Sequence, residues 1–124
     1  MIDRALLVEA SALFNRKLYF ECHDLLEGAW SESRGEDRGF LQALIHVSVG
    51  LYHLAAGNHQ GAKNLLERGI AALEPLAPEH AGLDLAGLLP PVRRCLAKSE
   101  RALSGESIEW EAADVPVMKL VEVE

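Results

Sequence analysis

The stretch 40–56, FLQALIHVSVGLYHLAA, constrains the fold more than any other part of the sequence. On a helix its apolar residues spread around almost the whole circumference and leave one narrow polar stripe. The stripe consists of Gln42, His46 and His53, which lie within about 40° of one another on the helical wheel. A helix that is apolar on nearly every side belongs in the interior of a protein. We therefore predict a buried central helix with the other helices packed around it.

The composition is that of a globular protein and excludes two classes of partner. The chain has 124 residues, of which 49% are hydrophobic and 25% charged, so one hydrophobic core suffices. Its formal net charge of −7 argues against a nucleic-acid partner and against binding to an anionic membrane surface, because both require a basic surface. The N-terminal residues lack the pattern of a signal peptide, and the polar stripe interrupts the apolar run at 40–56. We expect a cytoplasmic protein.

The apolar periodicity predicts five helices that pack as antiparallel hairpins, at residues 2–16, 18–32, 40–56, 60–73 and 90–103. Asp3 suits the start of the first helix, Gly57 suits the end of the third, and Asn58 can cap the fourth. The segment 31–38 contains no apolar residue and is predicted to be a solvated loop. Cys22 and Cys95 fall on apolar helix faces, so we expect buried free thiols and no disulfide.

Two features concern domain organisation. Residues 1–105 are predicted to form a single helical domain, followed by an extended acidic C-terminal tail at 106–124 that lies over the body or is exchanged with a partner subunit in a homodimer. A shift of about 40 residues aligns the segment DLLE, 24–27, with NLLE, 64–67. This spacing raises the hypothesis of a duplicated, tetratricopeptide-like helical hairpin.

The candidate site combines residues of the second and third predicted helices. His23 and Glu27 are four residues apart and therefore share one helix face. If the two helices pack antiparallel, these side chains could converge with His46 and His53, with Glu21, Asp24 and Gln42 as outer candidates. Such nitrogen and carboxylate groups suit a divalent metal such as zinc, iron, manganese or nickel. The spacing, however, is neither that of HExxH nor that of the Glu-x-x-His pairs of di-iron bundles.

Three interpretations of this cluster remain open. In the first, the residues form a buried hydrogen-bond network that Trp30 and Tyr19 cover, because buried polar groups require partners. In the second they line a pocket for a small molecule or metal, and in the third they form an acid/base catalytic site.

Several of these motifs together resemble a known prokaryotic family, the one catalogued as domain of unknown function 309. They are FN at 14–15, YFECHDLLE at 19–27 with Trp30, FLQALIH at 40–46, His53, GN at 57–58 and GA at 61–62. The resemblance covers about residues 13–70 and implies a small, all-helical protein without an assigned activity. It also implies that Glu21, His23, Glu27, Trp30, Gln42 and His53 occupy signature positions. Lys17 stands where the family's turn glycine is expected, and His46 stands where glutamine is usual.

The sequence favours a non-catalytic binding or interaction module. One alternative is a metal-dependent enzyme, a hydrolase, with ligands from His23, Glu27, His46 and His53. A second alternative is a helical-hairpin scaffold that binds peptides. The expected partners are a second copy of the chain, another protein or a small ligand.

Overall fold

The computed structural model describes residues 1–122 and consists mainly of five α-helices. They are α1 (Arg4–Asn15), α2 (Tyr19–Glu32), α3 (Gly35–Ala55), α4 (His59–Leu73) and α5 (Leu85–Leu103). The shorter elements are the 3-10 turns η1 (Glu74–Leu76) and η2 (Ala112–Asp114) and the strands β1 (Glu79–His80) and β2 (Leu83–Asp84), which pair antiparallel. Each helix packs against the next one in the chain. The prediction of an all-α fold built from five sequential antiparallel helices is confirmed.

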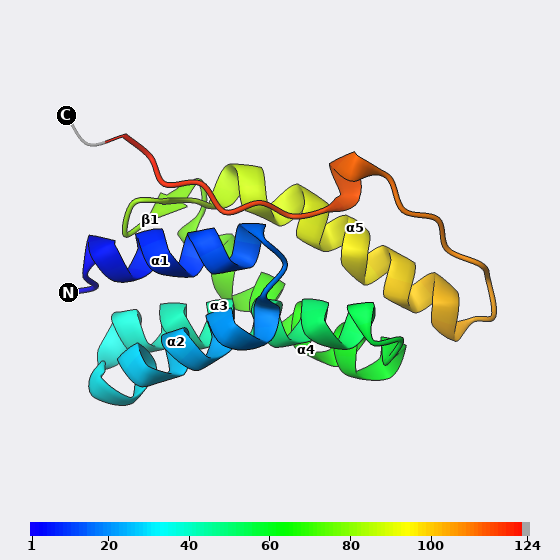
Figure 1. The fold of residues 1–124 in the computed structure, drawn as a ribbon, viewed down its shortest axis with the longest axis horizontal. Coiled ribbons are helices and arrows are strands. Elements are labelled where there is room, and N and C mark those ends of the chain that lie inside the picture. Colours follow the sequence, from blue (N-terminus) through cyan, green and yellow to red (C-terminus); the bar gives the residue numbers. More distant parts are fainter. Residues whose placement is uncertain (123–124) are drawn as a thin grey trace.

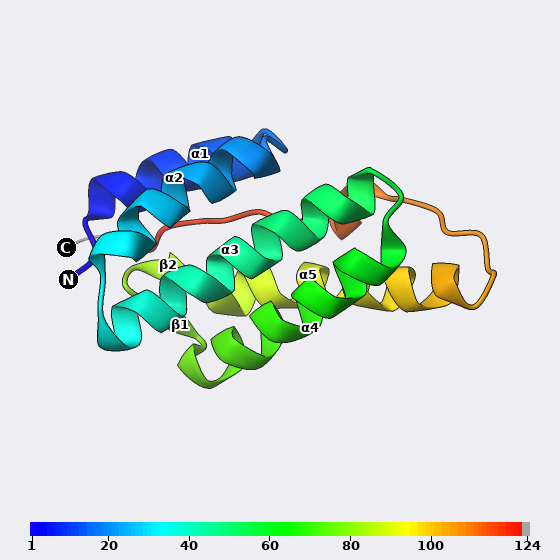
Figure 2. The same ribbon diagram turned by 90° about the horizontal axis from the view of Figure 1, so that it is seen from below.

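The helices form two layers, as Figures 1 and 2 show. Helices α2, α3 and α4 lie side by side, and α1, the C-terminal segment and α5 cover one side of them. Fully buried side chains from both layers form one core, among them Phe14, Leu26, Leu44, Leu66 and Leu88. Within residues 1–122, no helix is long and apolar enough to cross a membrane.

The helix ends follow the local sequence signals. The Asp3 side chain accepts a hydrogen bond from the Ala5 N–H at 3.0 Å, and Asn58 caps α4 through the Gly61 N–H at 3.0 Å. Gly57 has a φ of +81°, as expected for the residue that ends α3. Lys17, in the turn between α1 and α2, has a φ of +62°. This is a conformation that glycine adopts most easily, which explains why a glycine would suit that position.

Two predicted helix starts are wrong. Helix α3 begins at Gly35 rather than at Phe40, so the charged segment before Phe40 forms an exposed helical turn and not a loop. Helix α5 begins at Leu85 rather than at Pro90, because the Asp84 side chain caps it by accepting from the Gly87 N–H at 3.0 Å. Pro90 and Pro91 then lie inside the helix, where their fixed φ is compatible with helical geometry.

Helix α3 is not enclosed on every side. Its apolar face is buried between α2, α4 and α5, but Gln42 and Tyr52 are exposed and His46 and His53 are only half-buried. The structure therefore does not show the predicted central helix with the other helices packed all around it. Among residues 1–122, no element covers the face that carries the polar stripe, which is why its polar groups remain within reach of water.

Small residues allow α3 and α4 to pack closely. A Cβ atom on Gly69 of α4 would lie 2.6 Å from Cγ2 of Val47, and one on Gly50 of α3 would lie 2.8 Å from Cδ2 of Leu66. Both distances are shorter than real carbon contacts, so each glycine is required by the neighbouring helix. Gly69 therefore lets α4 lie close against α3. Gly61 has a different role, because its nearest neighbour is the side chain of the cap residue Asn58.

After Gly105 the chain is extended apart from η2 and runs back past α5 and α1 (Figure 1). Asn15 of α1 holds it with two hydrogen bonds, donating to the Met118 carbonyl at 2.9 Å and accepting from the Met118 N–H at 2.8 Å. Further along, the Val121 N–H donates to the Gly82 carbonyl at 2.7 Å. Met118 is almost completely buried, so this segment is part of the core.

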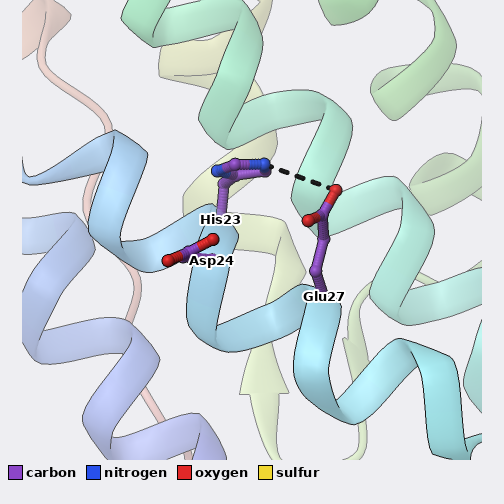
Figure 3. Close-up of side chains that lie close together, drawn as sticks. All are labelled: His23, Asp24 and Glu27. Atoms are coloured by element: carbon purple, nitrogen blue, oxygen red, sulfur yellow. Dashed lines mark ion pairs between the residues drawn. The ribbon is translucent and has the colours of Figure 1, made fainter.

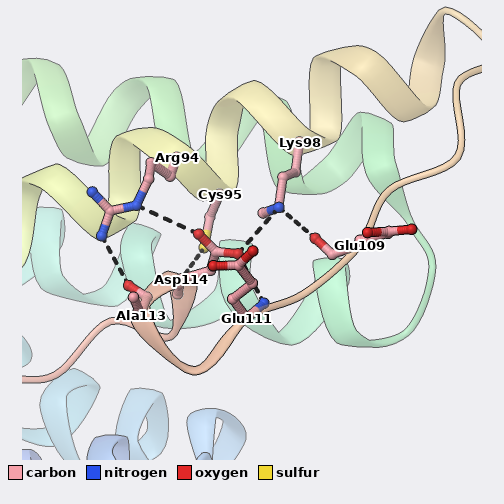
Figure 4. A network of polar contacts seen from close by, with 7 residues as sticks. All are labelled: Arg94, Cys95, Lys98, Glu109, Glu111, Ala113 and Asp114. Atoms are coloured by element: carbon pink, nitrogen blue, oxygen red, sulfur yellow. Dashed lines mark hydrogen bonds and ion pairs between the residues drawn. The ribbon is translucent and has the colours of Figure 1, made fainter.

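A polar network fixes η2 to α5 (Figure 4). The Asp114 carboxylate lies 3.2 Å from Nζ of Lys98 and 3.5 Å from Nε of Arg94, and it accepts from the Glu111 N–H at 3.0 Å. The Cys95 thiol donates to the Asp114 carbonyl at 3.4 Å. The hydrogen bond from Glu111, together with Lys98, lowers the pKa of Asp114 below its ordinary value of 3.8.

The two cysteines are buried and free, as predicted. Burial raises the pKa of the Cys22 thiol, and it raises that of Cys95 to about 11 with a contribution from the nearby Asp114 charge. Neither thiol has the lowered pKa of a catalytic nucleophile.

Candidate functional site

The seven candidate residues come from two neighbouring helices but separate into distinct groups. Glu21, His23, Glu27 and Trp30 lie on α2, whereas Gln42, His46 and His53 lie on α3. Because the helices are antiparallel, the end of α2 lies opposite the start of α3. Their polar side chains therefore meet in pairs along the seam rather than at a single point.

The first group is formed by α2 alone (Figure 3). Nε2 of His23 lies 3.4 Å from Oε1 of Glu27, and one ligand atom each of His23, Asp24 and Glu27 lies within 4.8 Å of the others. The His23 side chain is 16% exposed and that of Glu27 is 53% exposed. We call these three residues the His23 group. The group is open to solvent on one side while its imidazole is largely sheltered.

The hydrogen bonds of His23 define the state of its ring. Nδ1 lies 2.9 Å from the Phe20 carbonyl oxygen, which can only accept, so Nδ1 carries a proton and donates it. In a neutral ring, Nε2 then presents a lone pair to the Glu27 carboxylate. Two acceptors at this distance repel each other unless a cation, either a proton or a metal ion, lies between them. A histidine whose second ring nitrogen donates to a backbone carbonyl is also the usual arrangement of a metal ligand.

The second group connects the end of α2 to α3. The Trp30 indole N–H donates to Oε1 of Gln42 at 3.0 Å, which leaves the Gln42 amide group to donate to Nε2 of His46 at 3.4 Å. His46 therefore accepts at Nε2. Burial and the positive charge of Arg68 both lower the pKa of His46, so the neutral ring is favoured.

His53 lies at the other end of α3 and takes part in the connection to α4. Its Nδ1 lies 3.4 Å from the amide nitrogen of Asn58, the residue that caps α4. Beside it, Tyr52 and Phe20 bring their rings to 5.8 Å, and Phe20 lies 5.1 Å from the His23 ring. We call Phe20, His23, Tyr52 and His53 the aromatic strip. Phe20 is 51% exposed and Tyr52 is 45% exposed, so this strip is an apolar patch on the surface.

Glu21 stands apart from these groups. It is exposed in the first turn of α2 and forms no hydrogen bond or ion pair with another part of residues 1–122. A carboxylate at this position stabilises the helix N-terminus through the helix dipole. That is the role that the structure supports for Glu21.

The predicted four-ligand metal set does not form. Only His23 and Glu27 of that set lie together, whereas His46 bonds to Gln42 and His53 to Asn58. The physical reason is the helix rise: seven residues separate His46 from His53 by roughly 10 Å along α3, and one metal ion cannot bridge that distance. Asp24, which the sequence offered only as an outer candidate, completes the group instead.

The hydrogen-bond network has the expected contacts of Glu27 and Gln42, but the prediction that it is buried is wrong. Glu27 and Gln42 are exposed, and Trp30, His46 and His53 are half-buried. These residues hydrogen-bond as a network would, but they do so at the surface, where water and ligands can reach them.

One functional candidate was missed because it lies in the segment interpreted as a loop. Arg38 stacks on the Trp30 ring, with its guanidinium carbon 3.8 Å from the ring centroid, and donates to the Trp30 carbonyl at 3.3 Å. Arg38, Gln42 and His46 follow one another at intervals of four residues and share a face of α3. This four-residue spacing is present in the sequence, but it indicates a shared face only if α3 is known to begin before Arg38.

The family comparison covers the part of the chain that holds these groups. Residues 7–65 match the family described as Domain of unknown function (DUF309). The match includes α2, nearly all of α1 and the whole of α3. Residues 7–65 therefore carry a DUF309 domain, and the resemblance drawn from the sequence motifs is confirmed.

A curated bacterial protein is similar to a large part of the chain. The chain is similar to the uncharacterised protein YpuF of Bacillus subtilis (strain 168), with 36% identity over 93 residues, which is 73% of this chain and 53% of YpuF. The chain thus spans about half the length of the curated relative that it matches. Its function has to be argued from its own residues.

Proposed function

We propose that this protein is a small helical binding module whose ligand is a divalent transition-metal ion held by His23, Asp24 and Glu27. The observation that carries the proposal is the hydrogen bond from Nδ1 of His23 to the Phe20 carbonyl, which turns the Nε2 lone pair toward Glu27. This arrangement favours a cation between the two side chains.

The chemistry of the His23 group limits which ions fit. One imidazole nitrogen and two carboxylates suit zinc, iron or manganese better than copper(I), which prefers sulfur ligands. Since Asp24 and Glu27 are exposed, water molecules complete the coordination. A bound water is also what a metal-dependent hydrolase would require, so metal-assisted hydrolysis is the activity that the same site would support.

The test titrates the metal-free protein with zinc chloride and, separately, with manganese chloride. Isothermal calorimetry measures binding, and thermal unfolding with and without the metal measures stability. We expect one equivalent to bind and to raise the melting temperature, because a ligand that binds only the folded state stabilises it. His23→Ala should abolish both effects, whereas the control His53→Ala should bind as the wild type does. Equal loss in both variants, or no binding by the wild type, would contradict the proposal.

The aromatic strip supports a second function, self-association. Phe20 and Tyr52 expose about half of their area on one face of the α2–α3 pair, and aromatic side chains are favoured at the centres of protein interfaces. The occupant we propose is a second copy of the chain. Analytical ultracentrifugation should show a concentration-dependent dimer that Phe20→Ser with Tyr52→Ser disrupts and that the control Val8→Ser, at an exposed position of α1, preserves. A wild type that stays monomeric at all concentrations would refute this function.

A duplicated helical hairpin, as in tetratricopeptide-like peptide scaffolds, is the remaining hypothesis. Its support is that the aligned segments 24–27 and 64–67 have the same burial at each of their positions, with the second leucine fully buried in both. Superposition of α1–α2 on α3–α4 in a crystal structure tests it, and clearly different interhelical angles would contradict it.

A further inference from the structure

A cavity of about 320 Å³ opens between the first half of α3 and the second half of α4. Its titratable lining residues are Arg38 and His46 from α3 and Arg68 from α4. The two arginines are positively charged, and none of the lining residues is acidic. The amide of Gln42 adds a further polar group. The rest of the lining is small: Gly35, Gly39, Ala43 and Ala72. In a chain with a formal net charge of −7, a cavity lined by two arginines and a histidine but by no carboxylate is out of keeping with the rest of the surface.

Two of these polar groups are held in place by one side chain. The face of Trp30 supports the Arg38 guanidinium at 3.8 Å, and its indole N–H binds Gln42 at 3.0 Å. Arg38 also donates to the carbonyl oxygens of Trp30 and Ser33 through Nη1, so the guanidinium has little freedom to move. Trp30 is therefore a positioning residue for the cavity, although it does not line it.

Arg68 is free to receive a ligand. Within residues 1–122 its guanidinium forms no hydrogen bond and no ion pair, whereas Arg93 and Arg94 of α5 each pair with a carboxylate. The charge of Arg68 reaches the cavity, because it contributes to the lowered pKa of His46. An anion bound beside both side chains would raise the pKa of His46 again.

Gly39 of α3 lines the cavity, and helix packing does not require a glycine at this position. A Cβ atom on Gly39 would meet nothing within 4 Å, in contrast to Gly69 and Gly50. A glycine inside a helix costs up to about 1 kcal/mol relative to alanine, so the packing of the protein alone would favour alanine here. Because Gly39 lines the cavity, its missing side chain leaves room there for a ligand.

We propose that this cavity, which we call the basic pocket, binds one small oxyanion, either a phosphate or a carboxylate group, between Arg38 and Arg68. Arginine is the side chain that best matches the geometry of both groups. The volume is at the lower end of the range for ligand pockets, which fits a small metabolite. The basic pocket shares no residue with the His23 group, so this proposal does not depend on metal binding.

The test uses inorganic phosphate and citrate as probes, titrated separately into the full chain at constant ionic strength and followed by calorimetry and by the histidine signals in NMR spectra. Arg68→Gln should weaken binding at least about tenfold. Its control is Arg93→Gln, which removes the same charge outside the pocket and should leave binding unchanged. Binding of either probe with this pattern supports the proposal, and the tighter probe identifies the chemical group.

A glycine pair provides a test that is independent of charge. Gly39→Ala should stabilise the protein and weaken anion binding, because its methyl group enters the pocket. Gly28→Ala is the matched control, because Gly28 lies in α2 and also has nothing within 4 Å of an added Cβ. It should stabilise the protein without affecting binding. The proposal is overturned if neither probe binds, if Arg93→Gln weakens binding as much as Arg68→Gln does, or if both alanine variants bind equally.

Discussion

Replacement of glycine by alanine should have opposite effects on stability at Gly69, in the contact between α3 and α4, and at Gly28 of α2. At Gly69 the added methyl group would lie 2.6 Å from Cγ2 of Val47, 3.2 Å from the Ala43 carbonyl oxygen and 3.3 Å from the Val47 nitrogen. Val47 is fully buried and β-branched, so it cannot turn aside, and the other two atoms belong to the backbone. Helices α3 and α4 would have to move apart.

The magnitude follows from two opposing terms. Overpacking of this kind costs roughly 1–3 kcal/mol, whereas replacing glycine by alanine inside a helix contributes up to about 1 kcal/mol. Because two of the three contacts are with backbone atoms, we take the upper half of the overpacking range, and Gly69→Ala should then lower the free energy of unfolding by about 1–2 kcal/mol. Gly28→Ala, which meets no neighbouring atom, should raise it by roughly 0.5–1 kcal/mol. Urea unfolding followed by circular dichroism measures both changes.

A double-mutant cycle identifies the atom responsible. Val47→Ala alone removes two buried methyl groups and should cost roughly 2 kcal/mol. Combined with Gly69→Ala, it should cost less than the sum of the two single changes by at least about 0.5 kcal/mol, because the new methyl group occupies the vacated space. A Gly69→Ala variant as stable as the wild type, or strictly additive effects, would refute the account of this interface.

Four further predictions concern stability and pH. Ser11→Ala should raise the free energy of unfolding by about 1 kcal/mol, because the buried Ser11 hydroxyl has no hydrogen-bond partner among residues 1–122; destabilisation in urea unfolding would contradict this. Lys17→Gly should raise it by up to about 1 kcal/mol in the same assay, because the backbone there has a φ of +62°; a loss of stability would argue against strain. The stability that Asp114 contributes is present above its unfolded pKa of about 3.8 and lost as pH falls through its lower folded value, so Asp114→Asn should be less stable than the wild type at pH 7 and closer to it near pH 2. At the other extreme, burial raises the pKa of Cys95 to about 11, so stability should fall as pH rises above about 9, where the unfolded thiol ionises first; Cys95→Ala should reduce this fall.

Helix boundaries could be predicted from the sequence only where local signals decide them. Asp3, Gly57 and Asn58 act within a few residues of their own positions, and all three take the expected roles. The start of α3 was misjudged because an exposed first turn has no apolar residue to reveal it. The start of α5 was predicted too late because the pair Pro90-Pro91 is itself typical of a helix start, whereas the true cap is Asp84.

The candidate site could be predicted as a set of residues but not as an arrangement. His23 and Glu27 lie together because helical spacing alone brings them onto one face. The contacts of Trp30 could not be predicted in this way, because Gln42 and Arg38 belong to α3 and Trp30 belongs to α2. The basic pocket depends in addition on Arg68 of α4, to which no local pattern points.

The sequence by itself determined the helical class, the caps of α1 and α4, the buried thiols and the pairing of His23 with Glu27. All of these follow from interactions over a few residues or from the amphipathic pattern of a single helix. Only the tertiary structure decided that the polar stripe of α3 faces solvent, that Trp30 of α2 bonds to Gln42, and that Arg38 and Arg68 line one cavity. The reason is that hydrophobic burial fixes which face of a helix turns inward, whereas the polar neighbours on the outer face are set by how the helices are positioned against one another.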